Sequence, residues 1–475
     1  MKKIILILLV LIQWGCSQSP KTTTDISEVN ALLRTITIDA IKEKEYEQAK
    51  RSIDALIINN SEKWDFIQSA IISLPPSLAM QSIEKALSKK SVAQSSDKLF
   101  ALSKVFISYK KTKQALSLIN QSIKLDNNNL EARYWRARLQ TVLKNHAEAE
   151  IDFKYITKKS PENENYSTQY ASFLQETKRF DEAQNILAKQ KPTPDGLFKR
   201  VVFALQNKNI TVAEQSFNEL KNLKVEDKQL NHKIFLIAES AYWLKNYVES
   251  EKYYKQVTGG NHYLDAQDML SLILFDDKRF DEAIEILHQL ENAEEKYAIK
   301  AYRLESQIYK EQNDLDESIA VLTRALQIIP NNPTLLYDRA MLFESQSKID
   351  LLEIDLKQII ADDPKNHEAY NALGYSLVDH DLKLEEAYEY IKKAIELDPE
   401  NPAIIDSLGW AQYKLGHYED AAASFQKALD LDINDPELYI HFYKTLLKLN
   451  KKDEAKELIL KAKKLFPENN EITNL

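Results

Sequence analysis

The sequence predicts an all-α fold, an α-solenoid of about 13 helix–turn–helix repeats that wind into a right-handed superhelix. The main observation is that an alanine, or in a few repeats another residue, returns about every 34 positions over almost the whole chain. Glycine is also scarce, with 7 in 475 residues, as expected of a mostly helical chain. Each repeat of a solenoid contacts only its neighbours, so we expect an extended curved surface of the kind that binds proteins. The recurring positions are Ala49, Ala79, Ala115, Ala149, Ala183, Ala213, Ser250, Ala283, Ser318, Leu352, Ala387, Ala421 and Ala455.

The repeat can be followed inside one unit, residues 402–433. Leu408 and Gly409 occupy its seventh and eighth positions, Ala421 the twentieth and Phe425 the twenty-fourth. Small residues at such positions let two helices cross closely, and large residues fill the space between helices at the i, i+3, i+4 spacing of a buried face. A period near 34 residues with this pattern is the signature of the tetratricopeptide (TPR) repeat.

Regularity differs along the chain. The predicted blocks are irregular TPR-like repeats at 28–190, middle repeats at 191–260 and a regular C-terminal array at 261–475. Proline and glycine interrupt the middle block at KPTPDG (191–196) and at Gly259-Gly260, which are either ordinary turns between repeats or hinges between blocks. The hexapeptide KRFDEA occurs at 178–183 and again at 278–283, about three repeat lengths further on, which predicts two equivalent helix starts.

The first residues predict secretion. Met1-Lys2-Lys3 precedes an apolar run from Ile4 to Ile12, which is too short to span a bilayer because a spanning helix needs about 20 residues. We therefore expect residues 1–15 to be a lipoprotein signal peptide that is removed.

Cys16 is the only cysteine of the chain and lies where a bacterial lipoprotein signal would be cut. The stretch resembles a lipobox, although Gln13 and Trp14 depart from the usual residues. The alternative is a stray cysteine of the signal peptide. Lipidation at Cys16 would make residues 16–27 a lipidated flexible tether. By resemblance to proteobacterial lipoproteins, Ser17 in place of aspartate implies the outer membrane, with the protein facing the periplasm.

The sequence contains no arrangement that predicts catalysis. Its eight histidines form no HExxH pair, and its few glycines leave no place for a phosphate-binding loop. Asp379-His380-Asp381 falls in a loop, where neighbouring side chains point in different directions, so we expect a solvated turn rather than a metal site. The net charge of −9 argues against nucleic acid as a partner. We expect a protein that is not an enzyme, with no cofactor and no metal; the opposing class is an enzyme whose site the sequence does not reveal.

The binding surface can be placed from repeat geometry. In TPR arrays, positions two, five, nine, twelve and thirteen of the first helix face the concave groove. Exposed aromatic side chains with polar neighbours are typical of protein-binding hot spots. In the last four repeats the predicted protein-binding residues are Tyr337, Asn371, Tyr375, Asp406, Trp410, Tyr413, Lys414, Lys444 and Lys448, with Met341, Asp379, Ile440 and Leu447 at further positions of the same face.

Two of these aromatic residues have an alternative interpretation. Trp410 and Tyr413 could belong to the core between repeats, because large aromatic side chains are often buried. The chaperone-tail clamp of other TPR proteins needs lysine at position five and asparagine at position nine. Here Asp406 and Trp410 occupy these positions, so we exclude that mode of binding.

The run from Tyr337 to Gly416 resembles the C-terminal repeats of proteobacterial outer-membrane TPR lipoproteins. Its most telling segments are NALGY (371–375) and DSLGW (406–410). Some members of that family are adaptors that bind and activate a periplasmic carboxyl-terminal processing protease and bring it substrates such as peptidoglycan hydrolases. The resemblance covers roughly the last third of the chain and implies the same class of function.

These observations together predict a lipid-anchored periplasmic scaffold or adaptor that binds envelope proteins. The alternative within the same class is a scaffold for secretion, pilus or polysaccharide-export assembly. The last repeat ends soon after Pro467, and we expect no polar capping helix beyond it, which leaves the oligomeric state open.

Overall fold

The computed structural model describes residues 26–431 and 435–475, and these residues form 28 helices and no strand. The predicted all-α solenoid is thereby confirmed. The predicted signal peptide, Cys16 and all but the last two residues of the predicted tether lie outside the described residues. None of the helices described is both long enough and apolar enough to cross a membrane.

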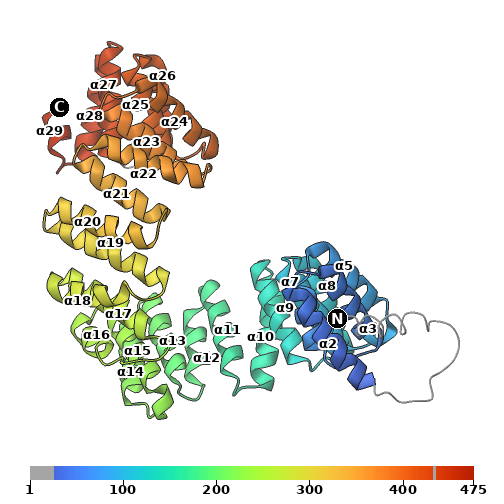
Figure 1. The fold of residues 1–475 in the computed structure, drawn as a ribbon. Coiled ribbons are helices and arrows are strands. Elements are labelled where there is room, and N and C mark those ends of the chain that lie inside the picture. Colours follow the sequence, from blue (N-terminus) through green and yellow to red (C-terminus); the bar gives the residue numbers. More distant parts are fainter. Residues whose placement is uncertain (1–25, 432–434) are drawn as a thin grey trace. The chain divides into compact units, whose positions relative to one another are not determined.

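The chain divides into two compact units, Met1–Leu223 and Lys224–Leu475. Figure 1 shows helices following one another in chain order within each unit. The helices of the first unit are α2 (Ile26–Lys42), α3 (Tyr46–Ile58), α4 (Trp64–Ile72), α5 (Pro76–Leu87), α6 (Lys90–Ala93), α7 (Ser96–Ser108), α8 (Thr112–Leu125), α9 (Leu130–Val142), α10 (His146–Lys159), α11 (Glu164–Glu176), α12 (Phe180–Ala188), α13 (Pro194–Gln206) and α14 (Ile210–Asn222). Those of the second are α15 (Asp227–Trp243), α16 (Tyr247–Tyr254), α17 (Tyr263–Asp276), α18 (Phe280–Leu290), α19 (Glu295–Glu311), α20 (Leu315–Ile328), α21 (Pro333–Ser345), α22 (Ile349–Asp362), α23 (His367–Asp379), α24 (Leu384–Leu397), α25 (Pro402–Lys414), α26 (Tyr418–Asp430), α27 (Pro436–Lys448), α28 (Lys452–Leu465) and α29 (Asn470–Asn474).

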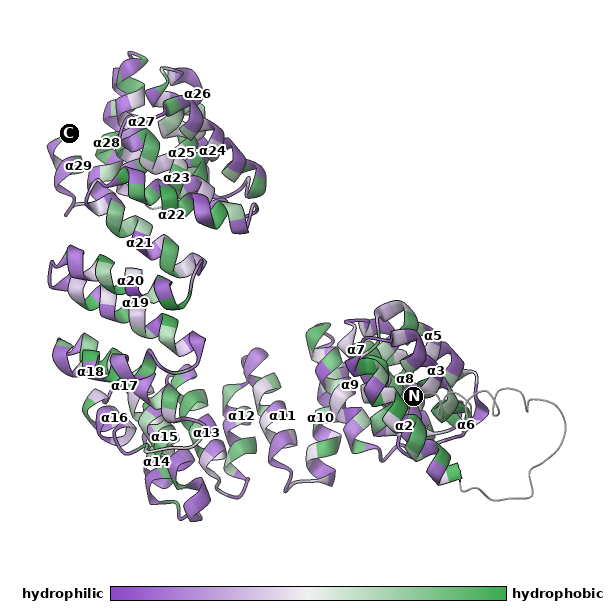
Figure 2. Cartoon of the chain, viewed as in Figure 1, coloured by the Kyte–Doolittle hydropathy of each residue, from purple (hydrophilic) through white to green (hydrophobic). Residues whose placement is uncertain are grey.

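The period of about 34 residues marks the second helix of each repeat. Every recurring residue predicted from Ala49 to Ala455 lies in such a helix, from α3 to α28, and every one of them is 0% exposed. Hydrophobic and hydrophilic residues are mixed along each helix, as Figure 2 shows, because one face of each helix packs on its neighbours and another faces solvent.

The second repeat departs from this pattern. Here α5 packs mainly on α3, while α4 packs on α7. Pro75 caps α5 and Pro76 begins it, and residues 73–75, which join it to α4, include no residue in the left-handed region. The short helix α6 follows α5, and this local arrangement accounts for the irregular spacing on either side of Ala79.

Two glycines permit close helix crossings. A Cβ atom at Gly374 would lie 2.5 Å from Cγ1 of Ile391 and 2.9 Å from the backbone oxygen of Ala387. One at Gly409 would lie 2.6 Å from the ring of Phe425. The prediction that small residues stand where helices cross is confirmed at these positions.

The turn between the two helices of a repeat contains a residue in the left-handed region. In eleven repeats this residue stands five positions before the recurring buried residue and has a φ angle between 53° and 84°. Glycine adopts this conformation most easily, yet only one of these turns uses it. The residues are Lys44, Lys110, Lys144, Lys178, Lys208, Lys245, Lys278, Asn313, Ser347, Gly416 and Asn450.

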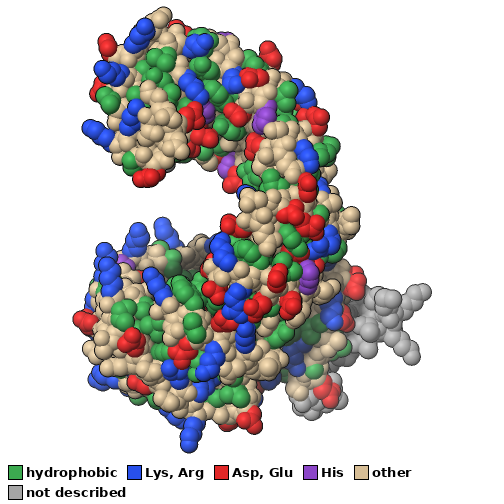
Figure 3. All heavy atoms as spheres, turned by 90° about the vertical axis from the view of Figure 1, so that its left-hand side faces the viewer, with side chains coloured by type: hydrophobic (Ala, Val, Ile, Leu, Met, Phe, Trp, Pro, Cys, Tyr) green, Lys and Arg blue, Asp and Glu red, His purple; other side chains and the backbone are tan. Residues whose placement is uncertain are grey.

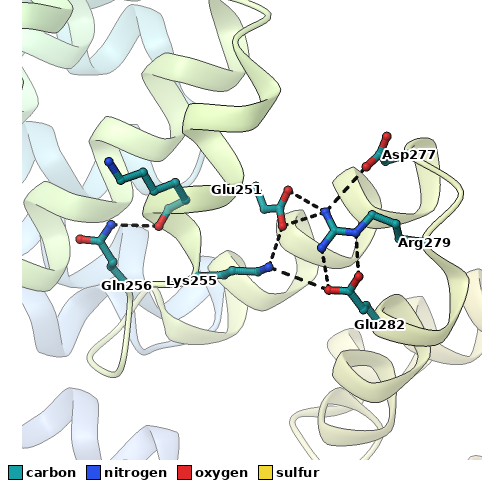
Figure 4. Close-up of polar contacts among 7 residues, drawn as sticks. Glu251, Lys255, Gln256, Asp277, Arg279 and Glu282 are labelled. Carbon is teal, nitrogen blue, oxygen red and sulfur yellow. Dashed lines mark hydrogen bonds and ion pairs between the residues drawn. The ribbon is translucent and has the colours of Figure 1, made fainter.

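The repeated hexapeptide builds an ion cluster that joins neighbouring repeats (Figure 4). Arg279 stands at the N-cap of α18, and its guanidinium lies 2.9 Å from Glu251 of α16 and 2.6 Å from Glu282 of its own helix. Lys255 also pairs with Glu251, at 2.6 Å. Burial alone would raise the pKa of Glu251, but hydrogen bonds from Lys255 and Arg279 outweigh it and lower the pKa.

The same cluster recurs in the first unit, which confirms the two equivalent helix starts. Arg179 pairs with Glu150 of α10 at 2.8 Å and with Glu182 of α12 at 2.7 Å. A third version, with lysine in place of arginine, joins α22 to α24. It consists of Glu353, Lys357, Lys383 and Glu386. We call these three groups the inter-repeat ion clusters.

The two breaks of the middle block are short connections. At the first, the Thr193 side chain accepts a hydrogen bond from the Gly196 amide at 3.0 Å and so caps α13. At the second, Gly260 has a positive φ of 83° before α17. The boundary between the two units falls at Leu223 and Lys224, inside the predicted middle block. Hinge motion at either break stays a prediction.

The chain ends in a short helix, so the expectation that no capping helix follows Pro467 was wrong. Asn469 caps α29, and Ile472 of this helix is 0% exposed against α27 and α28. A single buried isoleucine among polar residues is enough to cover part of the last repeat. A segment this short shows no hydrophobic periodicity, so its sequence does not predict a helix.

Candidate protein-binding groove

The predicted binding residues all lie on first helices of the C-terminal repeats, namely α21, α23, α25 and α27. One hydrogen bond links two helices of this face: the Tyr375 hydroxyl of α23 donates to Glu437 of α27 at 3.0 Å. Burial is the main cause that raises the pKa of Tyr375, and the nearby Glu437 adds to it. Burial likewise raises the pKa of Tyr337 on α21. Both tyrosines therefore stay protonated at neutral pH.

Trp410 belongs to the core, which corrects the expectation that it is exposed. Its side chain is 6% exposed and stacks between Tyr413 and His441, at ring-centre distances of 4.9 and 4.0 Å. Its indole nitrogen donates to Asp379 at 3.3 Å. His441 comes from the next repeat, so the burial of Trp410 depends on a neighbour that position counting within one repeat does not include. A role of Trp410 in partner binding stays a prediction.

The polar residues of this face are also largely engaged by the chain itself. Asp406 is 6% exposed, with a carboxylate oxygen 3.5 Å from Nδ1 of His441. Lys414 pairs with Asp381 at 2.8 Å, and Lys444 with Glu471 at 3.4 Å. The remaining two predicted residues are Lys448, whose ammonium lies 6.0 Å from the Tyr418 ring centre, and the half-buried Asn371. The groove at α23, α25 and α27 is thus filled mainly by its own side chains.

The three residues Asp379, His380 and Asp381 have separate partners. Asp379 accepts from Trp410, Asp381 pairs with Lys414, and Nδ1 of His380 lies 2.9 Å from the Ser376 carbonyl oxygen of its own helix. Their side chains do not converge on a common point.

A pocket of about 450 Å³ opens on the preceding repeats, between α17, α19 and α21. It is lined by Asp268, Leu272, Lys300, Arg303, Leu304, Ser306, Gln307, Lys310, Asp338, Met341 and Leu342. We call it the α19 pocket. Four of these residues, Lys300, Arg303, Gln307 and Lys310, occupy positions two, five, nine and twelve of their repeat.

Sequence reasoning missed this pocket, although the signal was present. The predicted face covers only the last four repeats, and Met341 is its one residue that lines the pocket. The same counting from Ala283 and Ser318 would have selected Asp268 and Leu272 on α17 and all four residues on α19.

Charge is unevenly compensated in the α19 pocket. Lys300 forms an ion pair with Asp268 on α17, and Arg303 pairs with Asp338 on α21 at 2.5 Å. Within the described part of the chain, the Lys310 side chain is exposed and its ammonium has no hydrogen-bond or ion-pair partner. Leu304 and Leu342 form a buried apolar floor. On the face drawn in Figure 3, cationic and anionic side chains are interspersed.

One further group of ionisable residues lies outside the pocket. The ligand atoms of His288, Glu291 and Glu305 lie within 4.8 Å of one another. Arg324 pairs with both carboxylates, at 3.0 Å for Glu291 and 2.7 Å for Glu305. Burial raises the pKa of Glu305. One of the two carboxylates' negative charges is therefore already compensated by the chain's own arginine.

Family comparisons agree with this architecture. The family model described as tetratricopeptide repeat matches residues 299–332, 367–401 and 402–435. The chain contains tetratricopeptide repeats. A further model, for subunit 3 of the anaphase-promoting complex (cyclosome), matches residues 79–155. The first tetratricopeptide match includes most of α19, one of the three helices of the α19 pocket.

Similar proteins align with only part of this chain. A TPR repeat-containing protein of Pseudomonas aeruginosa is 36% identical over 176 residues, which are 37% of this chain and 30% of that protein. The type IV pilus assembly protein PilF of the same organism is 24% identical over 142 residues, covering 30% of this chain and 56% of PilF. The alignments thus span less than two thirds of each relative.

Solved structures with similar helical arrangements include a tetratricopeptide repeat protein from Parabacteroides merdae, at 15% identity and a TM-score of 0.41, covering 52% of this chain and 97% of that one. The Cut9–Hcn1 assembly of the anaphase-promoting complex gives 16% identity and a TM-score of 0.37, covering 95% of this chain and 91% of the other.

Proposed function

We propose that this TPR protein is a non-catalytic scaffold that binds partner proteins through the first-helix face of its second unit. The observation that carries the proposal is the α19 pocket, which is built by three successive first helices and combines an apolar floor with charged side chains. Apolar area with a few placed polar groups is the composition of a recognition site. The predicted residues on α21 to α27 continue the same face of the repeats toward the C-terminus.

The proposal extends to location and partner. Acylation of Cys16 would hold the protein on the periplasmic side of the outer membrane. The partner would be a periplasmic carboxyl-terminal processing protease, together with cell-wall hydrolases as its substrates. Support comes from the lipobox-like residues before Cys16 and from the resemblance of residues 337–416 to TPR lipoproteins of that type.

A second candidate is a scaffold for pilus, secretion or polysaccharide-export assembly. The similarity to PilF favours it, since that protein's name assigns it to type IV pilus assembly. Both candidates share protein binding as the activity and differ in the partner. An enzyme with an unrecognised site remains the opposing class.

Photo-crosslinking tests the binding surface directly. A photoreactive amino acid at Gln307, which is exposed in the α19 pocket, should trap partner proteins in intact cells, and mass spectrometry then identifies them. The same amino acid at the exposed Lys456 of α28 is the matched control. Equal adducts from both positions, or none from Gln307, would contradict binding at this pocket. Recovery of a protease or of pilus components decides between the two candidates.

Lipidation has its own test. Wild-type protein in cells fed an alkyne-labelled fatty acid should carry the label and fractionate with the outer membrane. Cys16→Ser should abolish both, because the thiol is the acyl acceptor. Labelled Cys16→Ser protein in that fraction would refute the anchor.

A further inference from the structure

We infer that the α19 pocket selects an extended segment of its partner that carries an acidic side chain next to an apolar one. The inference rests on the proposed function, because it specifies what the same surface recognises. Three features of the pocket lead to it: its charge, its length along α19 and the number of free donors.

Charge is the first feature. The pocket lining contains three cationic residues and two carboxylates. Lys300 and Arg303 are neutralised by Asp268 and Asp338, so Lys310 is left as the uncompensated charge. The pocket lining therefore has an excess of positive charge, whereas the chain as a whole has a net charge of −9. A carboxylate would gain a charge-assisted hydrogen bond there, whereas a lysine or arginine would be repelled.

Length along α19 is the second feature. Lys300, Arg303, Gln307 and Lys310 follow one another at intervals of three or four residues and so share one face of the helix. At about 1.5 Å per residue this face is about 15 Å long. An extended peptide rises about 3.3 Å per residue, so about five of its residues would cover that distance. Its acidic residue would lie at the Lys310 end and its apolar residue over the leucine floor.

The third feature distinguishes an internal acidic side chain from a C-terminal carboxylate. Capture of a chain terminus typically uses several converging donors. Lys310 is a single ammonium, since the neighbouring cations Lys300 and Arg303 are already paired. The arrangement therefore fits one carboxylate of an internal aspartate or glutamate within the segment.

A synthetic peptide array tests this specificity. Peptides of about ten residues with varied acidic, basic and apolar content would be made twice, with an amidated and with a free C-terminus, and probed with the purified full-length protein. We expect the bound peptides to combine an acidic and an apolar residue, irrespective of the terminus. Lys310→Met should weaken their binding about fivefold, and Lys310→Glu should abolish the preference for acidic residues. Lys452→Glu, an exposed lysine of α28, is the control and should change nothing.

The outcomes separate the inference from the function on which it rests. Peptides that bind with no acidic preference, that need a free C-terminus, or that bind equally to Lys310→Glu would overturn the inference, while the protein-binding function would stand. If no peptide binds the wild type, and the crosslinker at Gln307 also traps no protein, both fail together.

Discussion

Replacement of Gly374 by alanine should destabilise the repeat formed by α23 and α24. The new methyl group would stand 2.5 Å from Cγ1 of Ile391 and 2.9 Å from the carbonyl oxygen of Ala387. Cβ atoms essentially never approach non-bonded heavy atoms within 3.0 Å, and the oxygen belongs to the backbone of α24, so the two helices must shift apart. Such overpacking costs about 1–3 kcal/mol, while alanine in a helix returns about 1 kcal/mol relative to glycine. Because one of the clashing atoms is a backbone oxygen, we take the upper part of that range, about 2–3 kcal/mol, and expect a net loss of about 1–2 kcal/mol in the free energy of unfolding.

Urea unfolding of the purified protein, followed by circular dichroism, measures the global effect. A solenoid can lose its repeats in separate steps, so hydrogen exchange within α23 and α24 should be measured as well. Gly259→Ala is the matched control, because the nearest atom to its new methyl group lies 4.0 Å away, and it should change stability by no more than about 0.5 kcal/mol. If Gly374→Ala protein unfolds at the same or higher urea concentration, with unchanged exchange in α23 and α24, our account of the helix crossing is wrong.

Trp410→Ala should lower the free energy of unfolding by about 3–5 kcal/mol in a urea titration, since the ring is buried between Tyr413 and His441; a change below about 0.5 kcal/mol would instead indicate a surface residue. Arg279→Met should slightly lower the thermal midpoint by removing the pairs with Glu251 and Glu282, and added salt should shrink the difference from wild type. Stability should also fall in acid: the folded-state pKa of Glu251 is lowered, so its contribution is complete above the unfolded pKa of about 4.3 and is lost as pH falls through the folded value. Melts from pH 7 to pH 3 should therefore show a smaller acid loss in Arg279→Met than in wild type, and identical losses would exclude the ion cluster as a cause.

Much of the fold could be predicted because one physical constraint repeats. Where two helices cross closely, a small side chain fits best, so residues such as Ala283 and Gly409 recur at fixed positions and reveal the repeat length, although Leu352 fills one of these positions. KRFDEA was informative for a related reason: its arginine reaches a glutamate of the preceding repeat, and the same contact forms at Arg179 and at Arg279.

The binding site was harder to predict because it depends on contacts between repeats. Position counting places Trp410 on the concave side but does not show that His441 of the next repeat covers it. Conversely, Lys310 becomes distinctive only once Lys300 and Arg303 are seen to pair with residues of α17 and α21. Such pairings depend on side chains in three helices, and no spacing within one repeat encodes them.

The left-handed turns have a consequence for how much stability this chain could gain. The left-handed conformation costs a residue with a Cβ atom roughly 1–2 kcal/mol. Seven of the turns have lysine at this position. Glycine would relieve the strain but would add freedom to the unfolded chain, so each replacement, for example Lys208→Gly, would return only part of that amount. Because the repeats contribute almost independently, such gains would accumulate along the array. The scarcity of glycine in these turns thus leaves this solenoid short of its attainable stability.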